Sequence, residues 1–379
     1  LMARPLLLLA CVALAACSEI APDGGSDAAL DEHALDGGDA LDATLAPDVA
    51  ADAPYLDGPV PCDAGGPCFA TPLALVTGPS RPTLVAVDAT NVYFTDGHAV
   101  NECAIGGCND APTTLWSSTY FYVEGIAAAL GNVYFTAGTQ YIASCAASGC
   151  NDKPTNLLTT LSTQFSGFAA DDENVYWTGA GIHACALAGC NETPFTYAMP
   201  AAVPNGLGID DPWIAWAEEG ASVKVCPKSG CVTAPLAIAA SSWAGPVAVA
   251  AGVVYWVDEG QPNGGRNVPI TKRTNGAILA CSATGCGGKP TVLASYPLWL
   301  GSGALVADAK GVYWSLEDVS GTFGEIAGCT ASGCDGAPTV YATTMSESTW
   351  KSPTAGLAID TANLYWTDYV AGAVFQTPR

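Results

Sequence analysis

A pair of cysteines followed by a proline recurs along most of this 379-residue chain and constrains its fold more than any other feature. Four residues separate the two cysteines, and the proline follows after three more, as in Cys103, Cys108 and Pro112. Five further copies keep this spacing, and a slightly longer copy precedes them all. In order, the pairs are Cys62–Cys68, Cys103–Cys108, Cys145–Cys150, Cys185–Cys190, Cys226–Cys231, Cys281–Cys286 and Cys329–Cys334. Such recurrence indicates a protein built from one repeated supersecondary unit.

A second motif, rich in β-branched and aromatic residues, alternates with the cysteine pairs. It reads Val175-Tyr176-Trp177 in the third repeat, and its copies are centred on Tyr93, Tyr134, Tyr176, Ala215, Tyr255, Tyr313 and Tyr365. Most copies lie about 40 residues apart, the repeat length of a four-stranded propeller blade. We assign strand a to the apolar run before the motif and strand b to the motif. Strand c leads into the first cysteine, and strand d follows the proline.

The two ends of the repeat series are complementary. The first cysteine-proline unit, residues 62–72, precedes any strand a or b, whereas the last strands a and b, residues 357–368, have no such unit after them. We therefore predict an all-β fold, a seven-bladed β-propeller over residues 62–379 with four antiparallel strands in each blade. Residues 72–77 should close the ring by pairing with 370–376. Strand d is the exposed edge of each blade, so the proline at its start hinders edge-to-edge pairing.

The last repeat carries a family resemblance. Leu364-Tyr365-Trp366-Thr367-Asp368 resembles the YWTD propeller repeats of the low-density-lipoprotein receptor class, and Leu357-Ala358-Ile359-Asp360 fits strand a of that family. Earlier copies depart from it, reading VYFTD, VYWTG or VYWVD. The receptors usually have six blades and lack the cysteine pairs. The resemblance implies an extracellular propeller that binds proteins or glycans and carries out no chemistry.

The fourteen repeat cysteines allow two interpretations. Each pair could form a disulfide, or two pairs could share a zinc ion. Pairs on different blades of a propeller are expected to point outward and cannot converge on one metal. We therefore predict one disulfide per blade, with no metal site and no cofactor.

The N-terminus predicts export and a lipid anchor. Residues 1–16 read as a signal peptide, because the apolar run Leu6–Ala16 is too short to span a bilayer as a helix. Leu14-Ala15-Ala16-Cys17 resembles a bacterial lipobox. This implies that Cys17 is acylated and that membrane lipid is a partner, with the outer membrane favoured by Ser18. An ordinary signal peptide with a chance cysteine is the alternative.

Composition limits the remaining possibilities. Residues 17–61 are rich in Ala, Asp and Gly and almost free of aromatics, so we predict an acidic disordered tether. The formal net charge of −24 repels nucleic acid, which we exclude as a partner. Regular cysteine pairing fits an oxidising compartment such as the periplasm.

Two sets of carboxylates recur at fixed places in the repeat. One set ends strand a and is expected to accept hydrogen bonds from the a–b turn rather than form a functional ring. Its members are Asp88, Asp171, Asp210, Asp308 and Asp360. The other set follows strand b, on the face formed by the b–c and d–a loops. These residues either bind a ligand or are solvated turn residues, and they include Asp96, Glu218, Asp258, Glu317 and Asp368.

Three insertions fall on that same face. Residues 259–276 lengthen the b–c loop of blade five, 317–326 that of blade six, and 343–354 the connection from blade six to blade seven. The first insertion brings Arg266, Lys272 and Arg273. Four tryptophans lie in or near d–a connections: Trp116, Trp243, Trp299 and Trp350. Exposed tryptophans beside carboxylates would suit a sugar face or a peptide, and packing between blades is the alternative.

These features predict a non-catalytic binding or scaffolding protein of the bacterial cell envelope. A glycan or an envelope protein would bind on the face of the long loops, toward blades five to seven. The alternative is a polysaccharide-active enzyme, a hydrolase or lyase, that uses rim carboxylates. Only three histidines and no phosphate-binding glycine loop argue against most other enzyme classes.

Overall fold

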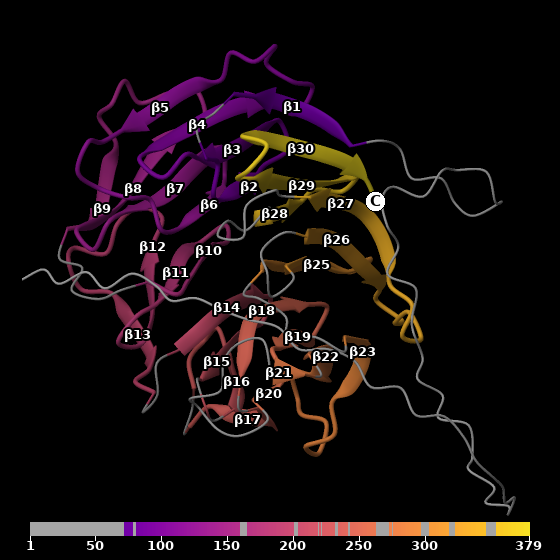
Figure 1. Cartoon of the computed structure of the whole chain (residues 1–379). Helices are drawn as coiled ribbons and strands as arrows, with labels where there is room; N and C mark the ends of the chain where they lie inside the picture. Colours follow the sequence, from indigo (N-terminus) through magenta and orange to yellow (C-terminus); the bar gives the residue numbers. More distant parts are fainter. Residues whose placement is uncertain are drawn as a thin grey trace, which may run out of the picture. The chain divides into compact units, whose positions relative to one another are not determined.

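Seven four-stranded antiparallel sheets follow one another along the chain, and each is one blade of the predicted propeller (Figure 1). The computed structural model describes residues 72–78, 81–159, 165–200, 204–218, 220, 222–231, 234–241, 243–262, 273–274, 276–296, 303–317, 323–345 and 354–379. All regular secondary structure within these ranges is β-strand. No helix in these ranges is long and apolar enough to cross a bilayer. The predicted signal peptide, Cys17, the tether and the Cys62–Cys68 pair lie outside the described residues.

Each blade is given with its strands in the order a, b, c and d. Blade one is β2 (Val85–Val87), β3 (Asn91–Thr95), β4 (Ala99–Ala104) and β5 (Thr113–Ser117). Blade two is β6 (Ile126–Ala129), β7 (Asn132–Ala137), β8 (Tyr141–Ala146) and β9 (Thr155–Leu158). Blade three is β10 (Gly167–Ala170), β11 (Asn174–Thr178), β12 (Ile182–Ala186) and β13 (Phe195–Ala198). Blade four is β14 (Pro204–Asp210), β15 (Trp213–Glu218), β16 (Ser222–Pro227) and β17 (Leu236–Ala240).

The remaining blades follow the same order. Blade five is β18 (Ala244–Ala250), β19 (Val253–Asp258), β22 (Gly276–Ser282) and β23 (Thr291–Tyr296). Blade six is β24 (Leu305–Ala307), β25 (Gly311–Glu317), β26 (Phe323–Thr330) and β27 (Thr339–Met345). Blade seven is β28 (Thr354–Ile359), β29 (Asn363–Asp368), β30 (Ala373–Pro378) and, from the other end of the chain, β1 (Leu73–Thr77).

The ring closes as predicted. Strand β1 pairs with β30, with Leu73 opposite Gln376 and Thr77 opposite Ala373, so blade seven takes its outer strand from the N-terminal side (Figure 1). The innermost strands of successive blades contact one another around the whole ring, and the last of these contacts joins β28 to β2.

The hydrophobic core lies between neighbouring blades. Tyr93 of blade one packs in one cluster with Val133 and Phe135 of blade two, and all three side chains are fully buried. Strand b is covered on both faces in this way. This explains why its sequence is a continuous apolar run rather than an alternation of apolar and polar residues.

Six disulfides join the predicted pairs, with Cα–Cα distances of 5.1–5.5 Å. The expectation that they point outward is wrong. The first cysteine of each pair is buried, and the pair packs against strand d of the preceding blade. The Sγ atom of Cys150, for example, lies 3.2 Å from the carbonyl oxygen of Leu115. Each disulfide turn is therefore part of a blade-to-blade contact.

An acidic residue two positions after the second cysteine strengthens this contact in blades one to three. The Asp110 carboxylate accepts a 2.6 Å hydrogen bond from the Thr77 amide, at the end of β1 in blade seven. Asp152 binds the Ser117 amide at 3.1 Å in the same way, and Glu192 binds that of Thr159 at 3.0 Å.

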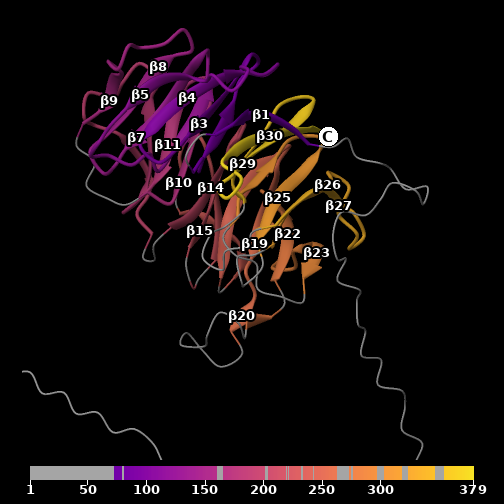
Figure 2. The same cartoon turned by 45° about the horizontal axis from the view of Figure 1, so that its top comes forward.

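The three insertions differ in structure. Residues 261–262 and 273–274 pair as the short ribbon β20–β21 (Gln261–Pro262 and Arg273–Thr274), which projects beyond blade five in Figure 2. The assignment of residues 317–326 to a loop is wrong at both ends, because Glu317 pairs with Gly324 and so extends the β25–β26 hairpin. Residues 343–354 are likewise partly strand, since β27 ends at Met345 and β28 begins at Thr354.

Candidate binding face

Four of the five carboxylates that end strand a stabilise the a–b turn of their own blade, as predicted. Asp210 of blade four differs, because it accepts a 2.7 Å hydrogen bond from the Ala251 amide in the a–b turn of blade five. One Asp88 oxygen accepts hydrogen bonds from the Thr90 and Asn91 amides at 2.7 and 2.8 Å, and the other accepts one from the Tyr93 hydroxyl at 2.8 Å. Burial alone would raise the pKa of Asp88, but these hydrogen bonds hold it below the ordinary value. Asp171 and Asp360 repeat the arrangement.

On the opposite face, the aspartates that follow strand b accept hydrogen bonds from the amides of the b–c turns. The Asp96 carboxylate binds the Ala99 amide at 2.9 Å, and that of Asp258 binds the Gly260 amide at 3.0 Å. Asp368 accepts bonds from the Val370 and Ala371 amides at 2.9 and 2.8 Å. It is only 5% exposed, and burial raises the pKa of its carboxyl. These three carboxylates hold the loops of the predicted binding face in shape.

Glu218 lies in a different setting at the end of β15. Its carboxylate accepts hydrogen bonds from the Trp216 indole at 3.1 Å and from the Lys224 ammonium at 2.8 Å, and its side chain is almost fully buried. Glu218 and Lys224 line a hollow of about 310 Å³ together with Tyr197 and Met199 of blade three. The hollow is therefore formed between blades three and four.

Only two of the four tryptophans fall within the described ranges. Trp116 is 5% exposed, and its ring lies 5.1 Å from that of Phe135 in the core between blades one and two. The interpretation of Trp116 as an exposed binding residue is therefore wrong, because the ring fills the contact between two blades. Trp243 is half-buried, and its carbonyl accepts a 2.9 Å hydrogen bond from the Glu259 amide.

The other predicted site residues are not brought together by the described part of the chain. Arg266, Lys272, Trp299 and Trp350 lie outside it. Arg273 and Glu317 are placed only by their backbones, in β21 and at the end of β25.

An aromatic segment of the same face was missed by the sequence reasoning. Residues 118–125 connect blade one to blade two, and Tyr120 and Tyr122 within them are 85% and 59% exposed. The signal was present as the run Tyr120-Phe121-Tyr122 in a d–a connection.

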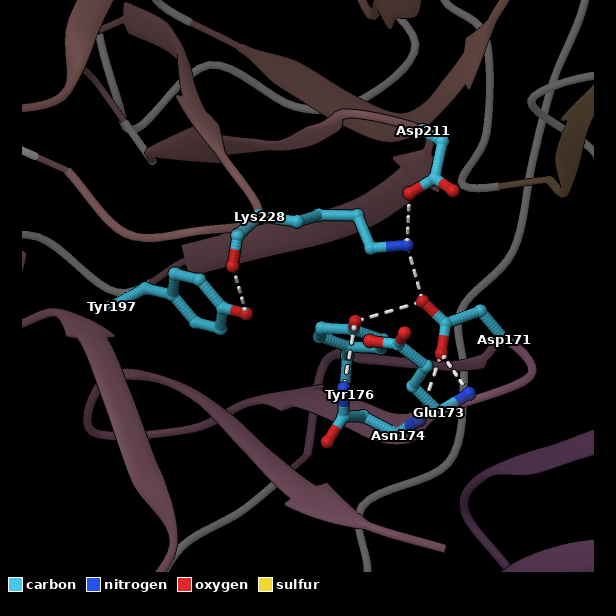
Figure 3. A network of polar contacts seen from close by, with 7 residues as sticks. All are labelled: Asp171, Glu173, Asn174, Tyr176, Tyr197, Asp211 and Lys228. Atoms are coloured by element: carbon cyan, nitrogen blue, oxygen red, sulfur yellow. Dashed lines mark hydrogen bonds and ion pairs between the residues drawn. The ribbon is translucent and has the colours of Figure 1, made fainter.

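A polar network crosses from blade three to blade four (Figure 3). The Lys228 ammonium of blade four forms ion pairs with Asp171 of blade three and with Asp211 of its own blade. It also lies 5.8 Å from the centre of the Tyr176 ring, and the Tyr197 hydroxyl donates a 2.8 Å hydrogen bond to the Lys228 carbonyl. The network therefore joins strands b and d of one blade to the c–d turn of the next.

The charges of this network reinforce one another. Burial opposes the charge on Lys228, but its hydrogen bonds to Asp171 and Asp211 raise the pKa of the ammonium above its ordinary value. Burial likewise opposes the charge of Asp171, yet the bond from Lys228 and the turn amides hold its pKa below the ordinary value. Both groups stay ionised through the neutral range, which suits a structural clamp better than proton transfer.

Comparisons with known proteins support the fold alone. No protein-family profile and no curated protein sequence matches the chain. The solved structure of the mitotic checkpoint complex aligns with a TM-score of 0.56 at 10% identity, over 86% of this chain and 97% of that one. The computationally designed Ika8 protein aligns with a TM-score of 0.52 at 11% identity, over 81% and 99%.

PorZ of Porphyromonas gingivalis, described as an essential bacterial surface component of the type-IX secretion system, aligns with a TM-score of 0.52 at 11% identity. The alignment covers 79% of this chain, which spans only 37% of PorZ. At these identities the likeness concerns the fold alone.

Proposed function

We propose that this chain is a non-catalytic binding or scaffolding protein of the bacterial cell envelope. Acylated Cys17 anchors it by lipid in the outer membrane, and residues 17–61 serve as the tether. Its ligand is a glycan or an envelope protein, bound on the face of the b–c and d–a loops. The YWTD-like repeats supply the blades of this scaffold.

The difference between the two faces of the ring carries this proposal. One face presents short a–b turns, four of which are held by the aspartate that ends strand a of the same blade. The other carries the β20–β21 ribbon and the extended β25–β26 hairpin (Figure 2). Variable loops on a rigid scaffold are the usual place for recognition.

The carboxylates on this face favour binding over turnover. Asp96, Asp258 and Asp368 each accept hydrogen bonds from turn amides, and Glu218 is paired with Lys224. A general acid and a nucleophile or base must instead be free to exchange protons with, or attack, a substrate.

A pull-down with isolated cell-envelope material tests the proposal. Trp299→Ala with Trp350→Ala, or replacement of residues 259–276 by a short turn, should weaken binding at least about tenfold, since aromatic and loop contacts supply most interface affinity. Leu130→Ala, in an exposed a–b turn of the opposite face, is the matched control and should bind like the wild type. Equal binding by all variants, or turnover of a glycan library by the wild type, would contradict the proposal.

The anchor is tested separately. Mass spectrometry of the mature N-terminus should find an acylated cysteine at position 17. An unmodified cysteine there, or a mature chain that starts elsewhere, would exclude the lipid anchor.

A further inference from the structure

The connection between blades one and two displays two tyrosines on a fixed support. Its alternate residues face opposite ways: Val123 is buried and Phe121 packs against the core, with its ring 5.9 Å from that of Tyr141, whereas Tyr120 and Tyr122 are exposed. Exposed phenol rings that flank buried anchors are held outward by the chain itself. A binding surface of this kind loses little conformational entropy when a ligand arrives.

Backbone hydrogen bonds fix this connection to the b–c turns of both blades. The Val123 amide donates to the Gly97 carbonyl of blade one at 2.8 Å, and the Gly138 amide of blade two donates to the Tyr122 carbonyl at 2.7 Å. Ser118 accepts hydrogen bonds from the Tyr120 amide at 3.1 Å and from the next amide at the same distance. The two tyrosines therefore belong to the face of the b–c and d–a loops.

A third ring completes the surface. His98, in the b–c turn of blade one, lies with its ring centre 4.0 Å from that of Tyr122, and the two planes are tilted by 37°. Its Nδ1 atom is 3.0 Å from the Phe121 carbonyl oxygen, which fixes the orientation of the imidazole. One side of the Tyr122 ring therefore packs on the imidazole, and the other side does not contact the histidine.

The charge around these rings limits what they can bind. Residues 82–152, which include all of blade one and strands a to c of blade two, contain no lysine or arginine. Lys153 of blade two lies in the c–d turn, on the opposite face, and Arg81 lies in the connection from blade seven. Glu124, in the same connection, is exposed, and Asp96 is in the adjoining turn. A phosphorylated or carboxylated polymer would find no cation here to offset its charge.

From these observations we infer that Tyr120 and Tyr122, supported by His98, form a stacking platform for an uncharged glycan. The apolar C–H face of a pyranose ring lies on a phenol ring, while polar groups at the rim satisfy the sugar hydroxyls. The inference rests on the proposed binding role, names the ligand class and adds a contact at blades one and two to the loops of blades five to seven. A peptide partner is the competing occupant, and the test distinguishes it.

The test measures binding of the full chain to maltohexaose and cellohexaose, which are uncharged, and to a hexameric polyuronate. The wild type should bind at least one neutral hexasaccharide and bind the polyuronate more weakly. Tyr120→Ala with Tyr122→Ala should weaken this binding at least about tenfold. Tyr120→Phe with Tyr122→Phe keeps both rings and should stay within about threefold of the wild type. Phe195→Ala removes a similarly exposed aromatic ring from an outer strand and should have no effect.

A second arm uses cell-envelope fragments, with and without protease treatment. If the wild type and the double alanine variant bind the fragments equally well, Tyr120 and Tyr122 do not form the binding platform. The proposed binding function would then still hold. Binding that protease treatment abolishes, or a preference for the polyuronate, would overturn the neutral-glycan assignment. If the wild type binds neither fragments nor oligosaccharides, the proposed function fails together with the platform.

Discussion

Lys228 and Arg379 occupy equivalent positions in blades four and seven, and each extends its side chain into the preceding blade. In blade four Cys226 pairs with Ile214, and in blade seven Thr377 takes the place of this cysteine by pairing with Leu364. Lys228 and Arg379 each lie two residues beyond that position. Lys228 reaches Asp171, whereas Arg379 reaches Asp308 and lies over the Tyr313 ring at 5.2 Å. At the same position Ile105 and Leu187 pack against apolar clusters. Two of the blade interfaces are therefore clamped by charge.

Replacing Lys228 should loosen the contact between blades three and four. Lys228→Met leaves Asp171 largely buried without its cation, and we expect the free energy of unfolding to fall by about 1–3 kcal/mol. Chemical denaturation at neutral pH measures the change. Lys289→Met, in the exposed c–d turn of blade five, should change stability by less than about 0.5 kcal/mol. Equal effects of the two substitutions would argue against the clamp.

Two aspartates of blade seven should respond to pH with opposite signs. Burial opposes the charge of Asp360, but hydrogen bonds led by that from Tyr365 lower its pKa in the folded state. Its ionised form therefore stabilises the fold above the ordinary pKa of 3.8, and this contribution is lost as the pH falls through the lowered value. Asp360→Asn should cost about 1 kcal/mol at pH 7, and the deficit should shrink below pH 3.8.

Asp368 is the matched partner. Burial raises its pKa in the folded state, so its contribution to stability is full below the ordinary pKa and is lost as the pH rises through the raised value. Asp368→Asn keeps an oxygen acceptor for the turn amides and should be as stable as the wild type, or more so, at pH 7. The stability of the wild type should rise relative to that of this variant as the pH falls. Thermal unfolding of both variants from pH 3 to 7 checks the two signs, and parallel pH profiles would contradict the assignment.

The hydroxyl of Thr367 should matter out of proportion to its size. It accepts a 2.8 Å hydrogen bond from the Gly356 amide and donates one of 3.1 Å to the Thr83 carbonyl, which joins blade seven to blade one. Thr367→Val keeps the shape but leaves the buried Gly356 amide and the half-buried Thr83 carbonyl without this partner, at a cost of about 1–3 kcal/mol. Thr113→Val, on an exposed edge strand, is the control and should be close to neutral in a melting experiment.

Removing one disulfide should destabilise the ring without opening it. Cys103→Ala with Cys108→Ala frees a short loop, and the chain-entropy relation gives a cost of about 2 kcal/mol. Melting temperatures under oxidising conditions measure this cost, and the difference from the wild type should narrow once reductant opens the Cys103–Cys108 bridge of the wild type. Alkylation without reductant should label none of the twelve cysteines in the described pairs. Bonds between different blades would contradict the pairing.

The blade count and the closure of the ring could be predicted because they follow from the order of motifs along the chain. The turn role of Asp88 was equally local, since its partners lie within five residues. The direction in which the disulfides point depends on contacts between residues distant in sequence. The c–d turn of each blade packs on strand d of the preceding one, and this arrangement alone brings Cys150 to Leu115 and Asp110 to Thr77.

The candidate site was harder to predict, because residue type does not determine exposure. Trp116 was expected to face a ligand and is buried between blades, whereas Tyr120, a few residues later, is among the most exposed large side chains described. Which member of an aromatic run points outward depends on the register with which its connection is bound to two neighbouring turns. That register is a property of the assembled ring.

The pairing of β1 with β30 also sets an order of assembly. Of the strands that the structure describes, β1 leaves the ribosome first, yet its partner β30 is made last. Until then, Leu75 and Val76, both buried in the finished ring, have no blade to enter. Because contacts distant in sequence form slowly, closure should be the late step of folding and the stage at which a nascent chain is most open to quality control. A chain that stops before β28 would have six blades, and its β1 would have no strand to pair with.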